Sequence, residues 1–292
     1  MRDARALFMA LGAAVLWGTT GTARALAPTG AAPLAVGAAR IAVGGAALVA
    51  LALVRGTLIR AWPPFPALAS ALAVAAYQLS FFEGVARAGV AVGTILAIGS
   101  APAFAGLLAW IALGERPGTR WIVATAVAVA GIALLASPGA AATIDPLGLL
   151  LPLAAGASYA VYATATKRLL ASADNVAVAA VAFGGGAVLL IPVLLVADMR
   201  WLSEPRGLGA VLWLGIAATA VAYLLFTRAL TRLPVSYGAT LSLAEPLTAS
   251  LLGVLVLGER LGPAQLAGAA LVAAGLAVLA TARSAAASAP RS

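Results

Sequence analysis

The chain lacks the side chains that most enzymes use for chemistry near neutral pH. Its 292 residues include no Cys and no His. The absence of Cys excludes disulfides and thiolate nucleophiles, and it leaves the redox compartment undetermined. The absence of His removes the usual proton shuttle near neutral pH and the commonest metal ligand. We therefore expect no metal site, no cofactor and no conventional catalytic centre.

Charged residues are also scarce. Only 9% of the chain is charged, 63% is hydrophobic, and the mean hydropathy is +1.07. Such a composition provides too little polar surface for a soluble globule of this length and indicates a protein embedded in a lipid bilayer. The net charge of +9 comes from basic residues that stand singly at the ends of apolar runs. A nucleic-acid partner is not expected, because a nucleic-acid footprint needs clustered Lys and Arg.

The hydrophobic residues form long runs. About 20 apolar residues are needed to cross a bilayer as a helix, since a rise of about 1.5 Å per residue must cover about 30 Å. Ten segments meet this requirement, so the sequence predicts an all-α polytopic membrane protein with ten transmembrane helices. The segments are Ala6–Ala25, Ala32–Val54, Phe65–Ala86, Ala88–Leu113, Arg120–Ser137, Leu147–Thr166, Val176–Ala197, Leu208–Thr227, Pro234–Gly258 and Pro263–Ala282.

The fourth and ninth segments are related in sequence. Residues 102–118 and 246–262 align at an offset of 144 with nine identities in seventeen positions, and both contain Leu-Gly-Glu-Arg, at 113–116 and 257–260. The chain is therefore interpreted as two related five-helix halves, residues 1–138 and 147–283. A turn-rich linker, 139–146, joins them, and a short polar tail, 284–292, follows.

The first segment has a second interpretation. Arg2 and Arg5, an apolar run and then Ala23-Arg24-Ala25 imitate a cleavable signal peptide. The repeat favours a retained helix, because Trp17-Gly18 has a counterpart in Tyr159-Ala160 at an offset of about 142. Removal of the first helix would leave one half incomplete.

The distribution of Lys and Arg predicts the orientation. With a cytoplasmic N-terminus, twelve of the 18 basic residues fall at inner ends, five at outer ends, and Arg40 within the membrane. This asymmetry predicts that both termini are cytoplasmic. Five helices per half is an odd number, so the second half must enter the bilayer upside down relative to the first. Inverted repeats of this kind are typical of secondary transporters, whose substrate site lies near the midplane between the halves.

The duplicated Pro-containing helix with its Leu-Gly-Glu-Arg ending, together with Trp17-Gly18, resembles the EamA family of the drug/metabolite transporter superfamily. The resemblance covers nearly the whole chain. It implies a ten-helix basket with a central cavity and alternating access in the cell membrane. It also implies transport of small metabolites, such as amino acids or drug-like solutes, often outward. It specifies neither the solute nor the oligomeric state.

Two other function classes remain open at this point. A passive pore or facilitator would have a similar sequence. A membrane-embedded lipid-modifying enzyme would need paired acids or a nucleophile system on one face, whereas only Arg40 and Glu245 lie deep within predicted helices. The chain has no Walker-type Gly-x-x-x-x-Gly-Lys-Ser/Thr loop and so does not hydrolyse nucleotide itself.

Arg40 and Glu245 are the predicted binding residues. A charge near the bilayer centre costs about 3 kcal/mol on insertion scales, and such residues usually face a cavity or a partner. Glu245 is predicted either to bind a substrate ammonium group or a coupled proton, or to be buried neutral or paired. Arg40 cannot easily lose its charge and needs an anion. That anion is either Glu245, a group of backbone carbonyls, or a substrate carboxylate.

Other candidates surround these two residues. Pro102 and Pro246 each remove a backbone donor at mirrored positions, so they are predicted to be bends of moving helices, with static kinks as the alternative. Aromatic and amide side chains are predicted to line the cavity, although any one of them is also compatible with packing or interface anchoring. They are Trp17, Tyr77, Gln78, Tyr159, Tyr162, Tyr223 and Tyr237.

The remaining charged residues are interpreted as structural. Glu115 and Glu259, in the two Leu-Gly-Glu-Arg motifs, are predicted to cap the helix that follows each motif. Arg24 lies near a helix end, where it can reach the headgroups. Glu83 and Arg87 are predicted to pair four residues apart on one helix.

Overall fold

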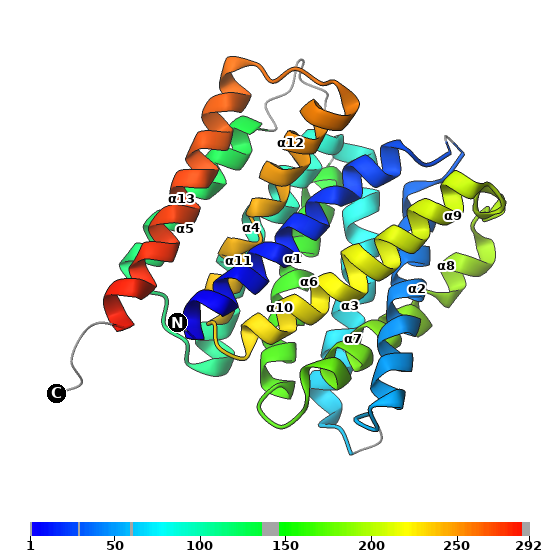
Figure 1. Ribbon diagram of the computed structural model, residues 1–292, viewed down its shortest axis with the longest axis horizontal. Coiled ribbons are helices and arrows are strands. Elements are labelled where there is room, and N and C mark those ends of the chain that lie inside the picture. The colour runs from blue at the N-terminus through cyan, green and yellow to red at the C-terminus, as the bar shows by residue number, and fades with distance from the viewer. Residues whose placement is uncertain (1, 29, 59–60, 136–145, 288–292) are drawn as a thin grey trace.

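The computed structural model describes residues 2–28, 30–58, 61–135 and 146–287 (Figure 1). Every regular element in these residues is helical. The predicted linker 139–146 lies outside the described residues except for Pro146, and the last part of the predicted tail, 288–292, also lies outside them.

Five helices form the first half, and each overlaps one predicted segment. Ala and other apolar residues predominate in all five, and two of the helices begin with Pro in the first turn, where its missing N–H would have no partner. The helices are α1 (Arg2–Ala25), α2 (Pro33–Val54), α3 (Pro64–Ala88), α4 (Val90–Leu113) and α5 (Thr119–Leu135).

The second half covers the other five predicted segments with more interruptions. Among the described residues of the whole chain, eight helical stretches are long and apolar enough to cross a membrane, and two apolar helices, Thr119–Leu135 and Asn175–Leu189, are shorter. The elements of the second half are α6 (Pro146–Leu169), α7 (Asn175–Leu189), α8 (Ile191–Val196), η1 (Arg200–Ser203), α9 (Pro205–Leu212), η2 (Trp213–Val221), α10 (Ala222–Leu230), α11 (Val235–Leu241), α12 (Ala244–Leu257) and α13 (Pro263–Ala287).

Three predicted helices are not regular throughout. The seventh breaks between α7 and α8, just before Pro192. The eighth contains η2, a π-helix, in which the Thr219 hydroxyl donates to the Leu214 carbonyl five residues earlier at 2.8 Å. The ninth is interrupted between α11 and α12 at Ser242 and Leu243. Breaks and π-turns of this kind frequently accompany functional sites in helical proteins.

The outer surface is apolar. Phe8 is 74% exposed, Phe65 76% and Leu195 79%, although each lies on a helix. A soluble protein would bury such side chains or use them for binding. In a membrane they face lipid, so the structure confirms an all-α, multi-pass membrane protein.

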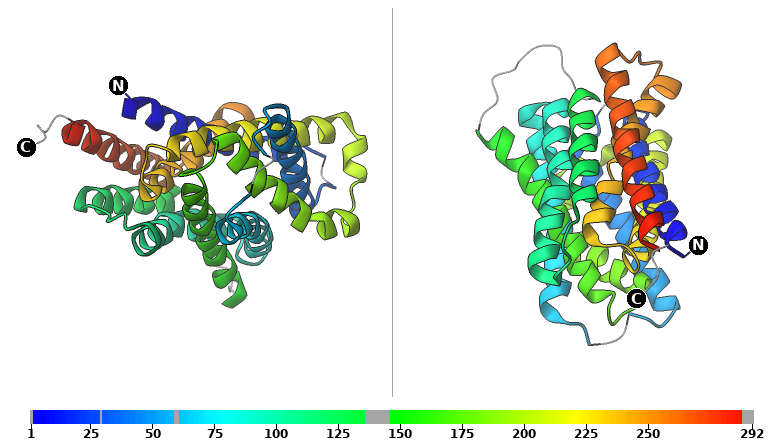
Figure 2. Two further views of the ribbon diagram at one scale, coloured as in Figure 1. Left: turned by 90° about the horizontal axis from the view of Figure 1, so that it is seen from below. Right: turned by 90° about the vertical axis from the view of Figure 1, so that its left-hand side faces the viewer.

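The two halves pack against each other along most of their length. Helix α6 lies against α3 and α4 of the first half, and α1 lies against α10 and α12 of the second. Helices α2 and α7 also pair, and α5 and α13 form one edge of the molecule (Figures 1 and 2). The beginning of α1 and the end of α13 lie at the same end of the bundle, which we call the N-terminal face. The end at which α1 finishes is the opposite face.

Glycines permit the closest of these approaches. A Cβ atom on Gly44 of α2 would lie 2.6 Å from the Gly215 carbonyl oxygen of η2, and one on Gly18 of α1 would lie 2.7 Å from the Glu245 carbonyl oxygen. Both distances are too short for a real side chain. The backbones can therefore approach only because these residues are Gly, as expected for helices that associate in lipid.

Candidate functional site

A cavity of about 510 Å³ lies between the two halves. This volume falls within the range of small-molecule sites. The cavity extends from the middle of the bundle to the opposite face, because Arg24, Val85 and Leu135 near the ends of α1, α3 and α5 line it together with Thr94 and Gln265 near the beginnings of α4 and α13. The remaining lining residues are Trp17, Gly18, Thr20, Gly21, Arg40, Tyr77, Phe81, Phe82, Ile98, Ile132, Glu245, Pro246, Ala249 and Ser250.

Arg40 is nearly buried and contacts the cavity from α2. Its side chain is 8% exposed, and Nη2 donates to Gln78 Oε1 on α3 at 3.3 Å. Its Nε atom has no hydrogen-bond partner among the described residues. The guanidinium group is thus held in place by an amide and retains unused donors beside the cavity.

Glu245 lines the same cavity from the other half of the chain. Within the described residues, no nitrogen of Arg40 lies within 4.0 Å of its carboxylate, so the two residues do not form an ion pair in this structure. Arg40 and Glu245 thus line one cavity without contacting each other as an ion pair.

The backbone around Glu245 differs from the prediction. Glu245 was expected near the middle of a continuous helix, but it lies in the first turn of α12, after the break at Ser242 and Leu243. The Ser242 carbonyl accepts from the Glu245 N–H at 2.9 Å, so it is not left free by Pro246. The positive end of the α12 dipole therefore faces the region of the Glu245 carboxylate. Interrupted helices at mid-membrane are a recurrent feature of transporter binding sites.

Trp17 and Tyr77 form the aromatic part of the cavity wall, on α1 and α3. Trp17 packs against Tyr223 with ring centroids 4.9 Å apart, and its Nε1 atom is buried without a hydrogen-bond partner in the described part of the chain. Tyr77 stacks on Phe81 with centroids 5.6 Å apart and planes 6° from parallel. Both rings present apolar surface to a solute.

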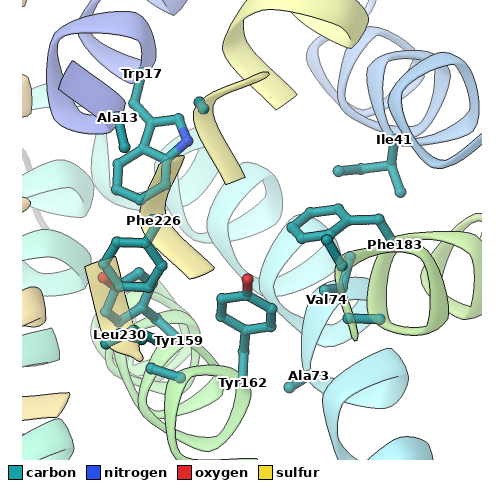
Figure 3. Close-up of a cluster of buried hydrophobic side chains, with 14 of the residues drawn as sticks. Ala13, Trp17, Ile41, Ala73, Val74, Tyr159, Tyr162, Phe183, Phe226 and Leu230 are labelled. Carbon is teal, nitrogen blue, oxygen red and sulfur yellow. The ribbon is translucent and has the colours of Figure 1, made fainter. Parts of the chain in front are cut away.

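The other predicted binding residues lie one layer away. Gln78, Tyr159, Tyr162 and Tyr223 line a small pocket next to the main cavity, and Tyr77 contributes to both spaces. The Tyr159 and Tyr162 hydroxyls have no hydrogen-bond partner among the described residues. Figure 3 shows Tyr159 and Tyr162 in the same aromatic cluster as Trp17, Phe183 and Phe226. Tyr237 packs in a separate apolar cluster and lines neither space.

The mirrored prolines have different surroundings. Pro246 lines the cavity within the first turn of α12. Pro102 is buried inside α4 and does not line the cavity. Their symmetry in sequence therefore does not extend to their local structure.

The predicted caps by the two motif glutamates are not found: the Glu259 carboxylate accepts no hydrogen bond from the described residues, and Glu115 has a different partner. Glu115 was expected to cap the following helix, α5, but its Oε2 atom accepts from the Val235 N–H at 2.7 Å and so caps α11 in the other half. The Glu83–Arg87 pair is confirmed, with Oε1 and Nε 2.7 Å apart.

Sequence reasoning missed several cavity residues. Arg24 was attributed to the headgroup region, yet it lines the cavity near the opposite face. Gln265 and Thr20 also line it, and neither is among the predicted residues. A polar residue near a helix end has an ordinary interfacial explanation, so no signal in a single sequence identifies it as part of a cavity.

Comparison with known proteins identifies the family. A model described as the EamA-like transporter family matches residues 4–137 and, a second time, residues 146–281. The chain belongs to this family. The resemblance noted in the sequence is thereby confirmed.

Several related proteins have transporter names. The uncharacterized transporter YwfM of Bacillus subtilis (strain 168) is 46% identical over 271 residues, which are 92% of each chain. A probable terminal-alkyne amino-acid exporter of Streptantibioticus cattleyicolor is 32% identical over 236 residues, 79% of each chain. The threonine/homoserine exporter RhtA of Escherichia coli (strain K12) is 35% identical over 153 residues, 50% of this chain and 48% of RhtA.

A solved crystal structure shares the fold. It superposes with a TM-score of 0.82 at 23% sequence identity and covers 95% of this chain and 96% of its own. This likeness supports the fold alone. Together with the family, the relatives establish that this EamA protein is a membrane transporter and not an enzyme.

Proposed function

We propose that this EamA transporter carries a small zwitterionic solute of the amino-acid type by alternating access. The observation that carries this proposal is the placement of Arg40 and Glu245 on one cavity wall without an ion pair between them. Each charged group in a low-dielectric site needs a counter-ion. A solute with a carboxylate at one end and an ammonium group at the other supplies both.

Each end of such a solute has a suitable partner. The planar guanidinium of Arg40 offers parallel N–H donors that match a carboxylate, and Gln78 fixes its orientation. Glu245 accepts from the ammonium group. Trp17 and Tyr77 contact the apolar part of the solute, and their rings also attract a cationic group by cation–π interaction.

The direction and location of transport are also part of the proposal. The relatives from S. cattleyicolor and E. coli are named as exporters of amino acids, which supports outward transport by this chain. We propose a position in the plasma membrane with both termini cytoplasmic, supported by the excess of Lys and Arg on that side. The cavity then opens to the outside.

Alternating access needs two equivalent halves, and we propose ten spanning helices arranged as two inverted repeats. The contacts between halves support this arrangement. At the α5–α13 contact, a Cβ on Gly131 would lie 2.7 Å from the Gly268 carbonyl oxygen, and one on Gly275 would lie 2.6 Å from the Ala124 carbonyl oxygen. At the repeat offset of 144, residue 131 corresponds to residue 275 and residue 124 corresponds to residue 268. One close contact is therefore the image of the other.

Glu245 is also the group that we propose for a coupled proton, since it is the only acidic residue among those lining the described cavity. A proton bound there and a solute ammonium group would compete for the same carboxylate. The helix interruption at Ser242 and Leu243, with Pro246 beside it, and the position of Pro102 inside α4 are the proposed points of movement.

Counterflow in proteoliposomes tests this function. Vesicles loaded with a mixture of unlabelled amino acids should accumulate labelled amino acids transiently, and the initial rate should saturate with concentration. Wild-type protein is compared with empty vesicles and with Glu83→Gln, which removes an acid outside the cavity. Flux that rises linearly with concentration and shows no counterflow would indicate a passive pore. Counterflow only of solutes lacking either charge would contradict the proposed solute class.

A further inference from the structure

Hydrogen bonds close the N-terminal face between the two halves. Each joins a residue of the first half to one of the second. Three of them lie near the end of α4 or α6 or the beginning of α5 or α11, and the fourth, between Thr125 and Thr240, lies deeper in the bundle. They are Val235 N–H to Glu115 Oε2 at 2.7 Å, Trp121 Nε1–H to the Ser236 carbonyl at 2.9 Å, Arg168 Nη2–H to the Ala112 carbonyl at 2.6 Å, and Thr125 Oγ1 with Thr240 Oγ1 at 2.8 Å.

The two Leu-Gly-Glu-Arg motifs have the same backbone structure. Gly114 and Gly258 both have a φ of 70° and end α4 and α12 in the left-handed conformation. In both motifs the N–H of the following glutamate donates to the carbonyl of the residue six positions earlier. The distance is 3.2 Å from Glu115 to Ala109 and 3.0 Å from Glu259 to Gly253. Any difference between the glutamates is therefore a difference in what their carboxylates contact.

That difference is large. Glu115 is half-buried and caps a helix of the other half. Glu259 is exposed, and its carboxylate accepts no hydrogen bond from the described residues. It lies against its own helix, since a Cβ on Gly253 would be 2.3 Å from Glu259 Oε2. The same motif is bonded across the halves at the closed face and unbonded at the face where the cavity opens.

The repeat relation locates the missing partners. At the repeat offset of 144, Arg168 corresponds to Arg24 and Trp121 corresponds to Gln265. Arg24 and Gln265 both line the open cavity. Val235, the residue capped by Glu115, is the first residue of α11, and the first residue of the corresponding helix, α4, is Val90. Thr94, one turn into α4, also lines the cavity. The cavity separates the segments whose counterparts are hydrogen-bonded on the N-terminal face.

We propose that Glu259, Arg24 and Gln265 form a second gate, which closes the opposite face when the N-terminal face opens. In that state Glu259 caps the beginning of α4 and Arg24 donates to the carbonyls at the end of α12, near Val256. Glu115 and Arg168 release their partners at the same time. The inference rests on the proposed alternating access, and it assigns a function to a motif that otherwise only ends two helices.

The proposed movement exchanges the hydrogen bonds on the N-terminal face for the corresponding ones on the opposite face, so the free-energy difference between the two states depends on how alike the two sets are. The contacts of Glu115 and Arg168 have images in Glu259 and Arg24, which are the same residue types, whereas the Trp121 contact has Gln265 in its place and the Thr125–Thr240 bond has no image. We therefore expect a difference between the two states that is small enough for a bound solute to shift the population. Loss of one gate glutamate should therefore bias the protein toward the state in which that glutamate is not used.

Labelling of a cavity cysteine tests the gate without any solute. Gly21→Cys is suitable because a Cβ there meets no atom within 4 Å and the wild-type chain has no Cys. In whole cells, its rate of reaction with an impermeant maleimide reports how often the cavity is open outward. A charge-assisted hydrogen bond is worth enough to change the ratio of the two states about tenfold. We expect Glu259→Ala to raise the labelling rate, Glu115→Ala to lower it, and Glu83→Ala to leave it unchanged.

The signs of these effects distinguish the possible failures. Opposite effects of Glu115→Ala and Glu259→Ala support the gate whatever the transported solute is, and reversed signs would mean only that the orientation in the membrane is reversed. Effects of the same sign, or no effect of Glu259→Ala, would overturn the gate. Equal labelling from both sides in all variants would indicate a pore and would overturn the proposed alternating access as well.

A second measurement covers the case in which Glu115→Ala does not reach the membrane. Thr94→Cys with Gln265→Cys places two thiols at the cavity mouth, and a disulfide requires their Cα atoms to approach within about 7 Å. Oxidation should join them when the mouth closes. The yield of this cross-link should fall in a Glu259→Ala background, whereas Glu259→Gln, which keeps an acceptor oxygen, should retain part of it. An unchanged yield in Glu259→Ala would refute the role of Glu259.

Discussion

The strongest prediction concerns the removal of Arg40 and Glu245, singly and together. If the two residues were a buried ion pair, either single substitution would leave an uncompensated charge and cost about 3–5 kcal/mol, and the double substitution would be much milder. The structure favours a different result, because no Arg40–Glu245 contact within 4.0 Å occurs and both side chains line a cavity.

The expected effects on folding follow from the contacts that are present. Arg40→Leu removes the donor to Gln78, which is 2% exposed, so the buried amide oxygen loses its partner at a cost of about 1–3 kcal/mol. Glu245→Gln removes no hydrogen bond made by a described side chain, so its cost should be below about 1 kcal/mol. We expect near-normal membrane yield for Glu245→Gln and a moderate decrease for Arg40→Leu. In the double variant the two effects on yield should add.

Transport should respond differently from yield. Each charge lost removes one charge-assisted contact to the solute, worth about 1.5–3 kcal/mol, so initial counterflow should fall by about 10- to 150-fold in each single variant. The double variant should be inactive. Arg40→Lys keeps the charge but not the planar fork, and it should retain only part of the activity.

The assay scores membrane yield and counterflow separately for the four variants and for Glu83→Gln as a matched loss of an acid. A severe loss of yield in both single variants, with recovery of yield and of transport in the double, would refute the assignment of a solute site. That pattern would show that the two residues serve each other.

Two further predictions address topology and movement. Reporter fusions after Gly139 and after Arg291 should report the outer and inner sides of the membrane respectively, and reports from the same side would contradict the inverted repeat. Pro102→Ala can restore a hydrogen bond to Ile98 inside α4, so it should slow counterflow without loss of yield. Pro246→Ala should have a smaller effect, because Pro246 lies in the first turn of α12, where no such bond is interrupted; a larger effect in Pro246→Ala than in Pro102→Ala would contradict this reasoning.

The general fold was predictable from sequence because the bilayer imposes a strict length and polarity requirement on each helix. The predicted segment Ala32–Val54 and the observed α2, Pro33–Val54, differ by one residue. The π-helix η2 and the interruption at Ser242 and Leu243 were not predicted. Both preserve the apolar character of their segments, so hydropathy carries no signal for them.

The site was partly predictable for a related reason. Arg40 and Glu245 were identified because a charge in an apolar run is costly and needs a function or a partner. Whether they meet each other or a solute depends on the positions of α2 and α12, which no local pattern specifies. The contact between Glu115 and Val235 likewise joins residues 120 positions apart. From the sequence alone, the adjacent helix was the nearest partner for Glu115, and that prediction was wrong.

The comparison of the two halves suggests why the symmetry is retained in one place and lost in another. The gate residues must do the same task on both faces, and Glu115 and Glu259 have kept the same residue type on the same backbone turn. The solute that we propose has two different ends, and a symmetric site would bind it poorly. Glu245 accordingly has Ala101 as its repeat mate. A transporter built from equivalent halves can therefore keep its two states close in free energy while its cavity distinguishes the carboxylate end of a solute from the ammonium end.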